Sequence, residues 1–342
     1  MASGRAYVAK EFGVLIGIQD QSEDGSNIGS APDAAGEILS KVQMGLSTIN
    51  DIAFDAGYQR SELSRAGRRA MRAEDVINHY GSGSWTFDFD WVCDNEVGLQ
   101  NLLNLIYPET ATTAASASGI VIPGAPTTTS MKHGMDGTVN TCGCVIIQNP
   151  ETTEDRFMHS AVLQNLTLSM AAGTNSGALN ASGQFYTGYK PVIAANTYTA
   201  DSSASDFQKG LFDCTTHTLG GTDVSVSAFS VTISNPATRV GYQGSSGEAD
   251  GYVRASDISV TGSITVKADS GTMGKIDAWQ ANTTQAIALT AGTATELDIQ
   301  IPAANMSGHN MTLADDGTMI EIPFTATTGA DGSGNLINIK AT

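Results

Sequence analysis

The chain has 342 residues, of which 41% are hydrophobic and 15% are charged, and its formal net charge is −18. This length and apolar content suffice for two domains with buried cores, which excludes a disordered chain. The excess of acidic side chains offers DNA phosphates little to bind through counterion release, which excludes a tight DNA-binding protein.

The N-terminal residues Met1 to Glu11 contain no apolar segment of the kind that a secretory signal requires, and no later run approaches the length of a membrane span. We therefore expect no membrane contact. We also expect the protein to be made and kept in the cytoplasm until it assembles.

Most segments with regular hydrophobic periodicity are predicted strands. The clearest alternation runs from Val224 to Ile233, where apolar side chains occupy one face and Ser or Thr the other, and Asn235-Pro236 ends it. In chain order the predicted strands are Phe12–Ile18, Trp85–Val92, Val162–Met170, Val224–Ile233, Ile258–Ala268, Gln285–Leu289, Leu297–Ile301, Met319–Thr325 and Leu336–Lys340. The fold class is therefore predicted to be mainly β.

Two segments have the periodicity of short helices. Asn95–Tyr107 places its apolar residues in one stripe, with Asp94 as the predicted N-cap and Pro108 as the stop. Thr272–Ala281 predicts a second, weaker helix. Residues 109–130 are rich in Ser, Thr, Ala and Gly without periodicity, which predicts a long loop.

A basic segment interrupts the acidic background. It contains Arg60, Arg65, Arg68, Arg69 and Arg72, opposed only by Glu62. A solvated loop or helix face is the ordinary explanation of such a charge run. If copies of this acidic protein stack on one another, the alternative gains weight: a basic loop would meet the acidic surface of the next copy, with a modest and salt-sensitive energy.

An eight-residue block occurs twice, at Gly83–Asp90 and at Gly262–Asp269. Gly, Ser, Thr and the final Asp are identical in the two copies, and each copy follows an Arg-Ala-x-Asp step that begins at Arg72 or at Arg254. In both places a predicted strand is followed by a short predicted helix. The repeat therefore predicts one structural unit that is used twice.

The division between the two units is predicted at Tyr189-Lys190-Pro191, which leads into a polar stretch. The predicted domains are residues 1–190, with the loop 109–130, and residues 191–342.

Aromatic residues alternate along the first copy of the repeated strand. They are Trp85, Phe87, Phe89 and Trp91. They could form a stacking platform for nucleic-acid bases, but a face this apolar is more simply the inner side of a β-sandwich. The opposite face then carries Asp88 and Asp90, and also Asp269 in the second copy if the register is the same.

The sequence contains no local signature of a nucleophile elbow, a phosphate-binding loop, a zinc-protease helix or a dinucleotide-binding loop. The histidines are scattered singly, and the acidic stretches at 201–206 and 315–317 lack the spaced ligands of a calcium-binding loop. We therefore expect no enzyme, no catalytic residue and no cofactor.

Four cysteines are present: Cys93, Cys142, Cys144 and Cys214. Reduced, partly buried thiols are expected in a cytoplasmic chain. The alternative is a metal site formed by Cys142 and Cys144 with His133 or His159. That spacing lacks the paired C-x-x-C elements of a zinc site, so no metal is predicted.

The segments Arg72–Tyr107 and Arg254–Ala281 resemble the major tail tube proteins of long-tailed, siphovirus-like bacteriophages, in which a Gly-Ser-x-Thr-x-x-x-Asp strand precedes a short helix. Val226–Asp269 resembles them too, because a strand ends in Asn-Pro and a Gly-rich loop leads to Arg-Ala-Ser-Asp. The resemblance implies two tandem tail-tube-type modules, each a β-sandwich or split barrel with a short helix and a long hairpin facing the lumen. Their sheets would close into a ring-shaped β-barrel through oligomerisation.

The same resemblance implies a structural virion protein that self-assembles as stacked rings into the tail tube, which conducts the DNA genome during ejection into the host. Two modules per chain imply a homotrimeric ring with pseudo-sixfold symmetry, and a homohexamer is the second possibility. The implied partners are further copies of the chain and the tail terminator, distal tail and tape-measure proteins, while double-stranded DNA passes without specific binding. The implied location is the virion tail, assembled in the host cytoplasm.

The charged residues acquire roles from this resemblance. Asp88, Asp90 and Asp269 are expected on the lumen or at a subunit edge, where carboxylates close to the bore repel phosphates despite screening over about 8 Å. The basic segment from Arg60 to Arg72 is expected between rings.

Two other classes remain open. A cell-surface or secreted Ig-like β-sandwich binding module would also be acidic and rich in Thr, although the missing signal segment argues against it. A carboxylate-based hydrolase with a split site is the other class, and no residue points to it. Electron microscopy separates a protein that polymerises from a monomeric module.

Overall fold

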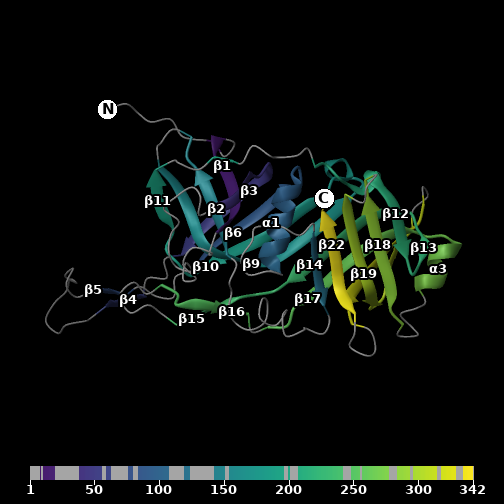
Figure 1. Ribbon diagram of the computed structural model, residues 1–342. Coiled ribbons are helices and arrows are strands. Elements are labelled where there is room, and N and C mark those ends of the chain that lie inside the picture. The colour runs from purple at the N-terminus through teal and green to yellow at the C-terminus, as the bar shows by residue number, and fades with distance from the viewer. Residues whose placement is uncertain are drawn as a thin grey trace.

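The computed structural model is mainly β, as predicted (Figure 1). It describes residues 8, 11–19, 38–55, 59–62, 76–79, 84–107, 119–123, 142–150, 154–195, 199–200, 207–241, 248–254, 256–276, 283–292, 296–313, 317–328 and 334–341. Within these ranges there are two α-helices, α1 (Glu96–Ile106) and α3 (Ser270–Ile276), and neither is long and apolar enough to span a membrane.

One antiparallel sheet, called the long sheet below, runs through the whole molecule. In spatial order its strands are β3 (Leu46–Asp55), β6 (Ser84–Val92), β10 (Asn180–Thr187), β9 (Glu154–Ala171), β14 (Val226–Ser234), β17 (Ser259–Lys267), β21 (Met319–Ala326) and β20 (Asn310–Thr312). The sheet does not close on itself within the described residues.

Two further groups of strands cover one face of the long sheet. The first consists of β2 (Ile38–Gln43), β1 (Gly13–Gln19), β8 (Gly143–Gln148), the start of β9 and β11 (Val192–Ala195). The second consists of β13 (Thr222–Asp223), β12 (Cys214–Leu219), β18 (Gln285–Ala291), the start of β19 (Leu297–Met306), β22 (Asn335–Ala341) and β7 (Gly119–Pro123). The predicted loop 109–130 therefore contains a strand, β7, and its other residues lie outside the described ranges.

The strand pairing repeats along the chain. Among the described strands, seven pairings in the first half recur in the same order in the second half. The first-half pairings are β1–β2, β1–β8, β8–β9, β9–β11, β9–β10, β10–β6 and β3–β6. Their counterparts are β12–β13, β12–β18, β18–β19, β19–β22, β19 or β20 with β21, β21–β17 and β14–β17. The hairpin of β4 (Gln59–Glu62) and β5 (Val76–His79) corresponds likewise to that of β15 (Thr238–Val240) and β16 (Gly251–Val253). The eight-residue block in the sequence thus lies inside a complete topological repeat.

The two halves meet along β9 and β14, which pair from Ala171↔Ala228 to Asn165↔Ser234. The division predicted after residue 190 stays a prediction. β11 lies beyond that point and pairs with β9, so a division that keeps this sheet intact follows residue 195.

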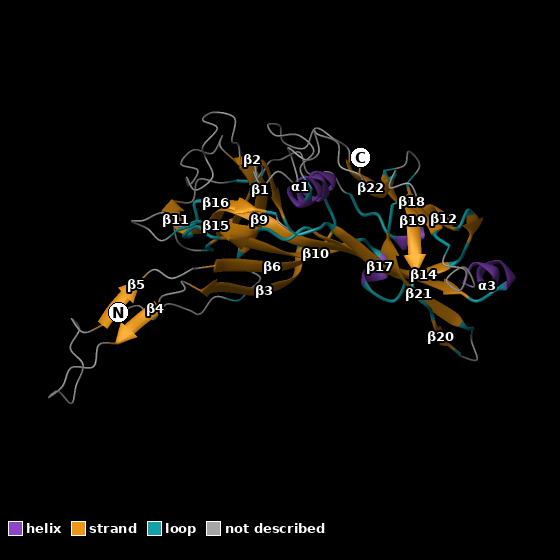
Figure 2. Cartoon of the chain, turned by 90° about the horizontal axis from the view of Figure 1, so that it is seen from below, coloured by secondary structure: helices purple, strands orange, loops and turns teal. Residues whose placement is uncertain are grey.

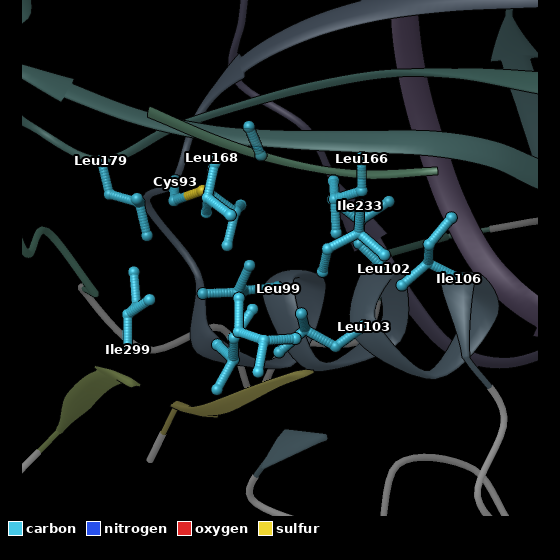
Figure 3. Close-up of a cluster of buried hydrophobic side chains, with 14 of the residues drawn as sticks. Cys93, Leu99, Leu102, Leu103, Ile106, Leu166, Leu168, Leu179, Ile233 and Ile299 are labelled. Atoms are coloured by element: carbon cyan, nitrogen blue, oxygen red, sulfur yellow. The ribbon is translucent and has the colours of Figure 1, made fainter. Parts of the chain in front are cut away.

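The core forms where the alternating strands turn their apolar side chains inward. The aromatic residues Trp85, Phe87, Phe89 and Trp91 of β6 are buried, as predicted, and the intervening Asp88 is exposed. Helix α1 adds Leu102 and Ile106, which lie beside Leu166 and Ile233 from the two halves of the long sheet (Figure 3). The core therefore continues across the junction between the halves.

Helix α1 begins one residue later than predicted. The N-cap is Asn95, whose side chain accepts hydrogen bonds from the backbone N–H groups of Val97 and Gly98. Asp94, the predicted cap, instead accepts a 3.0 Å bond from Trp91 Nε1. Helix α3 begins at Ser270 rather than Thr272, and residues 277–281 of that prediction lie outside the described ranges.

Candidate assembly surface

The face of the long sheet opposite the core, called the polar face below, is lined with hydroxyl and amide groups. One transverse row of register partners runs from Asp90 through Ser182, Thr167, Thr232 and Thr261 to Thr325. The next row is Asp88, Gln184, Asn165, Ser234 and Ser259. The Thr167 and Thr232 hydroxyls are 2.8 Å apart across the junction of the halves, so the polar face continues through it.

Charged side chains are sparse on the polar face. Those with described side chains are Asp88 and Asp90 in the first half, and Lys267 and Glu321 in the second. Gln184 Nε2 donates a 2.7 Å hydrogen bond to Asp88 Oδ1, and Asn180 Nδ2 donates to Asp90 Oδ1. The amides hold both carboxylates in place without neutralising them, so the first half carries the excess of negative charge.

Asp269 lies beyond the end of β17 and caps α3. Its Oδ1 accepts hydrogen bonds from the backbone N–H of Gly271 at 3.0 Å, and from the N–H and hydroxyl of Thr272 at 2.9 and 3.1 Å. These bonds, chiefly those from Thr272, hold the pKa of the carboxyl below its usual value. Asp269 thus follows the strand instead of lying within it, and its place on the lumen or at a subunit edge stays a prediction.

The side chains of the basic segment lie outside the described residues. Arg65, Arg68, Arg69 and Arg72 lie outside the described residues, as does the side chain of Arg60, whose backbone belongs to β4. The hairpin of β4 and β5 extends away from the sheets at one end of the molecule, while α3 and β20 lie at the opposite end (Figure 2).

Both ends of the long sheet are edge strands. Within the described residues, β3 pairs with β6 alone and β20 with β21 alone. Apolar side chains are exposed at the β20 end: Met311 is 41% exposed, Leu313 77%, and Met273 of α3 43%. Exposed apolar groups along an unpaired edge favour pairing with another chain. No local sequence signal marks this edge, because β20 has only three residues.

The junction inside the chain is a complete example of such a pairing. In the topological repeat, β14 corresponds to β3, and the C-terminal part of β9 corresponds to β20 with the end of β19. The β9–β14 pairing therefore joins the two kinds of strand that remain as edges at the ends of the long sheet.

Two of the cysteine and histidine side chains, those of Cys144 and His159, make hydrogen bonds within the protein. Cys144 Sγ donates to Gln19 Oε1, and burial raises the pKa of this thiol. His159 Nε2 lies 3.2 Å from the carbonyl of Lys190, and burial lowers the pKa of the imidazole. Across the described ranges no three His, Cys, Asp or Glu side chains are grouped as a metal site would need, and His133 lies outside those ranges.

A family model described as phage tail tube protein matches residues 14–330, which span both halves of the topological repeat. The curated proteins include no significant match to the chain.

Proposed function

The chain belongs to the phage tail tube protein family, and from this membership we propose that its copies close into rings, that the rings stack into the tail tube, and that the viral DNA passes through the tube during ejection. The family makes the chain a structural protein of the virion tail. Assembly in the host cytoplasm and the absence of enzymatic activity are part of the proposal.

The observation that carries ring closure is the match between the internal junction and the two free edges. We propose that β20 of one copy pairs with β3 of the next copy, as β9 pairs with β14 within a copy. The exposed Met311 and Leu313 would then be covered, and every edge strand of the long sheet would gain a partner. Closure would convert the open sheet into a barrel.

The proposed ring contains three copies. The described residues of each chain contribute eight strands to the long sheet, so a trimer would have 3 × 8 = 24 of these strands. Two corresponding halves per chain would give the ring pseudo-sixfold symmetry. A ring of six chains is the second possibility.

The polar face is proposed to line the bore. Hydroxyl and amide groups offer phosphates no fixed positive partner, and Asp88 and Asp90 repel them. A ring of three chains would have a formal charge of 3 × −18 = −54. Charge repulsion within about 8 Å of the bore would keep the duplex from adhering during passage.

The basic segment from Arg60 to Arg72 is proposed to meet the acidic surface of the adjacent ring. It would guide the orientation of stacking more than it would add affinity. Tail terminator, distal tail and tape-measure proteins are the proposed partners at the ends and in the bore of the tube.

Electron microscopy of the purified protein tests the proposal. We expect rings or tubes with a pseudo-sixfold end view and, by mass photometry, a mass per ring of 3 × 35.4 kDa, or about 106 kDa. A ring of twice that mass would contain six chains and would favour the hexamer over the trimer. A protein that stays monomeric at all concentrations, with β20 and β3 both unpaired, would contradict ring closure itself.

A further inference from the structure

Arg254 is buried at the junction of the two halves, with 6% of its surface exposed. Its hydrogen-bond acceptors are backbone carbonyls. Nη1 donates to Leu163 O at 3.3 Å and to Asn235 O, and Nη2 donates to Leu105 O at 3.3 Å. Burial lowers the pKa of the guanidinium to about 10, so the side chain stays charged at neutral pH.

These carbonyls come from both halves of the chain. Leu105 lies in the last turn of α1 and Leu163 in β9, both in the first half, while Asn235 follows β14 in the second. Asn235 Nδ2 also donates a 2.8 Å bond to Ile106 O. Carbonyls in the last turn of a helix lack intrahelical partners and carry partial negative charge, which a guanidinium complements. Arg254 and Asn235 therefore bind the second half to the end of α1.

Tyr252, two residues before Arg254, makes a second attachment. Its hydroxyl donates a 2.8 Å bond to Ser160 O and accepts a 2.9 Å bond from the N–H of Gly188. Ser160 has a φ of 49°, in the left-handed region, and lies where β9 leaves the first outer group of strands and enters the long sheet. Tyr252 and Arg254 thus bond β9 at Ser160, where it enters the long sheet, and at Leu163 just beyond.

We infer that the segment Tyr252–Arg254 is a strap that fixes the angle between the two halves. Strand pairing alone permits a range of twist between neighbouring strands, so the β9–β14 ladder does not by itself set this angle. The strap adds a bonded contact outside the ladder, on the bend of β9 and on the end of α1. Arg254 and Tyr252 are positioning residues.

The consequence for assembly rests on the proposed function. In a ring of three chains, the angle within each chain sets half of the junctions around the circumference. A loosened strap would therefore broaden the distribution of ring diameters, even in chains that stay folded.

The test measures the angle in the free chain. Spin labels at the exposed positions Gln43 and Thr215, one in each half, are introduced as cysteines in a Cys214→Ser background, and distances are measured by double electron–electron resonance. The variants are Arg254→Met, Arg254→Lys and Tyr252→Phe. The matched control is Arg156→Met, because Arg156 is an exposed arginine on β9.

We expect a narrow distance distribution for the wild type and for Arg156→Met, and a distribution at least twice as wide for Arg254→Met with an unchanged circular dichroism spectrum. Arg254→Lys should lie between them, since an ammonium group cannot span the same carbonyls. Unchanged widths in Arg254→Met would overturn the strap. If that variant does not fold, Tyr252→Phe, which loses only one hydroxyl, decides by the same criterion.

Ring diameters measured by electron microscopy complete the test. A wild type that forms no rings contradicts the proposed function and leaves the distance measurement as the test of the strap. Rings of wild-type diameter from a chain with a widened distance distribution would show that the strap does not govern the ring.

Discussion

Asn95 is the residue on which the first turn of α1 depends. Its side-chain oxygen accepts bonds from two N–H groups that have no partner within the helix, at 2.9 and 3.2 Å. We expect Asn95→Ala to lower the free energy of unfolding by about 1 kcal/mol, measured by urea denaturation. Asp94→Asn keeps an acceptor for Trp91 Nε1 and should cost less. An equal or larger loss for Asp94→Asn would contradict the assignment of the cap.

His159 should make stability depend on pH. Burial lowers the pKa of its imidazole, so between that pKa and about 6.5 the unfolded chain binds more protons than the folded chain. Stability should therefore fall as the pH drops through this window, by up to about 1.4 kcal/mol per pH unit.

Thermal unfolding of the wild type and of His159→Gln between pH 7.5 and 4.5 measures the effect. The variant should have a shallower slope below pH 6.5. Burial also lowers the pKa of His217. The variant His217→Gln therefore measures how much of the pH dependence of stability comes from His217. Identical slopes for the wild type and His159→Gln would exclude His159 as the source.

At the residue scale, what could be predicted was limited to features that repeat along a strand. Alternation placed the aromatic side chains of β6 in the core and Asp88 outside. It could not choose between Asp94 and Asn95, two residues with equal capping ability, because the choice depends on the indole of Trp91. Nor could alternation show that Asp269, which aligns with Asp90 in the repeated block, lies after the end of its strand.

At the scale of elements, β20 is the strand whose chemistry can be changed without touching the core. Met311 of β20 and Leu313 directly after it are exposed in the isolated chain but would be covered at the proposed junction with β3 of the next copy. Burying two ammonium groups there should weaken association by at least about 3 kcal/mol, or more than a hundredfold. We expect Met311→Lys/Leu313→Lys to remain folded and monomeric.

Analytical ultracentrifugation measures the oligomeric state of this double variant. Ile193→Lys is the control, because Ile193 is exposed on β11, outside the long sheet. Rings formed normally by the double variant would exclude the β20 edge from the junction, whereas a lowered melting temperature would indicate a defect of the isolated chain.

The same scale explains which strands could be found in the sequence. Strands with one buried face and one more accessible face, such as β14 and β21, alternate clearly between apolar and polar residues and were predicted. In β8 and the first half of β9, consecutive residues are buried, so period-two alternation is absent. Strands of two to four residues, such as β11, β13 and β20, are too short for periodicity to register.

For the whole molecule, the repeat is far more complete in topology than in sequence. Eight strand pairings recur within the described residues, the β4–β5 hairpin included, yet the sequence reveals the repeat through one block and one Arg-Ala-x-Asp step. Pairing depends on alternation and length, which many residues satisfy, whereas Gly262 of the block is required by a close contact. A Cβ on Gly262 would lie 2.1 Å from the carbonyl oxygen of Ser230. A larger side chain at Gly262 would therefore force the backbone of β14 or β17 to shift.

The basic segment should affect how rings stack rather than how they close. Replacing Arg60, Arg65, Arg68, Arg69 and Arg72 by Gln removes the positive charges proposed to face the next ring. At about 0.5 kcal/mol for each exposed pair, the rings should still form but elongate into tubes at higher protein concentration. Light scattering should show that salt slows elongation of the wild type more than that of the variant. Equal salt dependence would leave the segment as a solvated surface.

The polar face permits a test in which assembly and DNA passage separate. Asp88→Asn/Asp90→Asn retains an oxygen acceptor at each site, so Gln184 and Asn180 keep their bonds and the tube should form with unchanged dimensions. In a trimer, the change removes six negative charges per ring from the face proposed to line the bore. Weaker repulsion lets phosphates approach the wall, so DNA should leave variant virions more slowly, and the difference should shrink as salt shortens the screening length.

Fluorescence microscopy of stained DNA leaving single virions measures the rate. The control is Arg156→Gln, which removes a charge from an exposed residue in the first outer group of strands. Equally fast ejection from the wild type, the double variant and the control would place Asp88 and Asp90 away from the DNA.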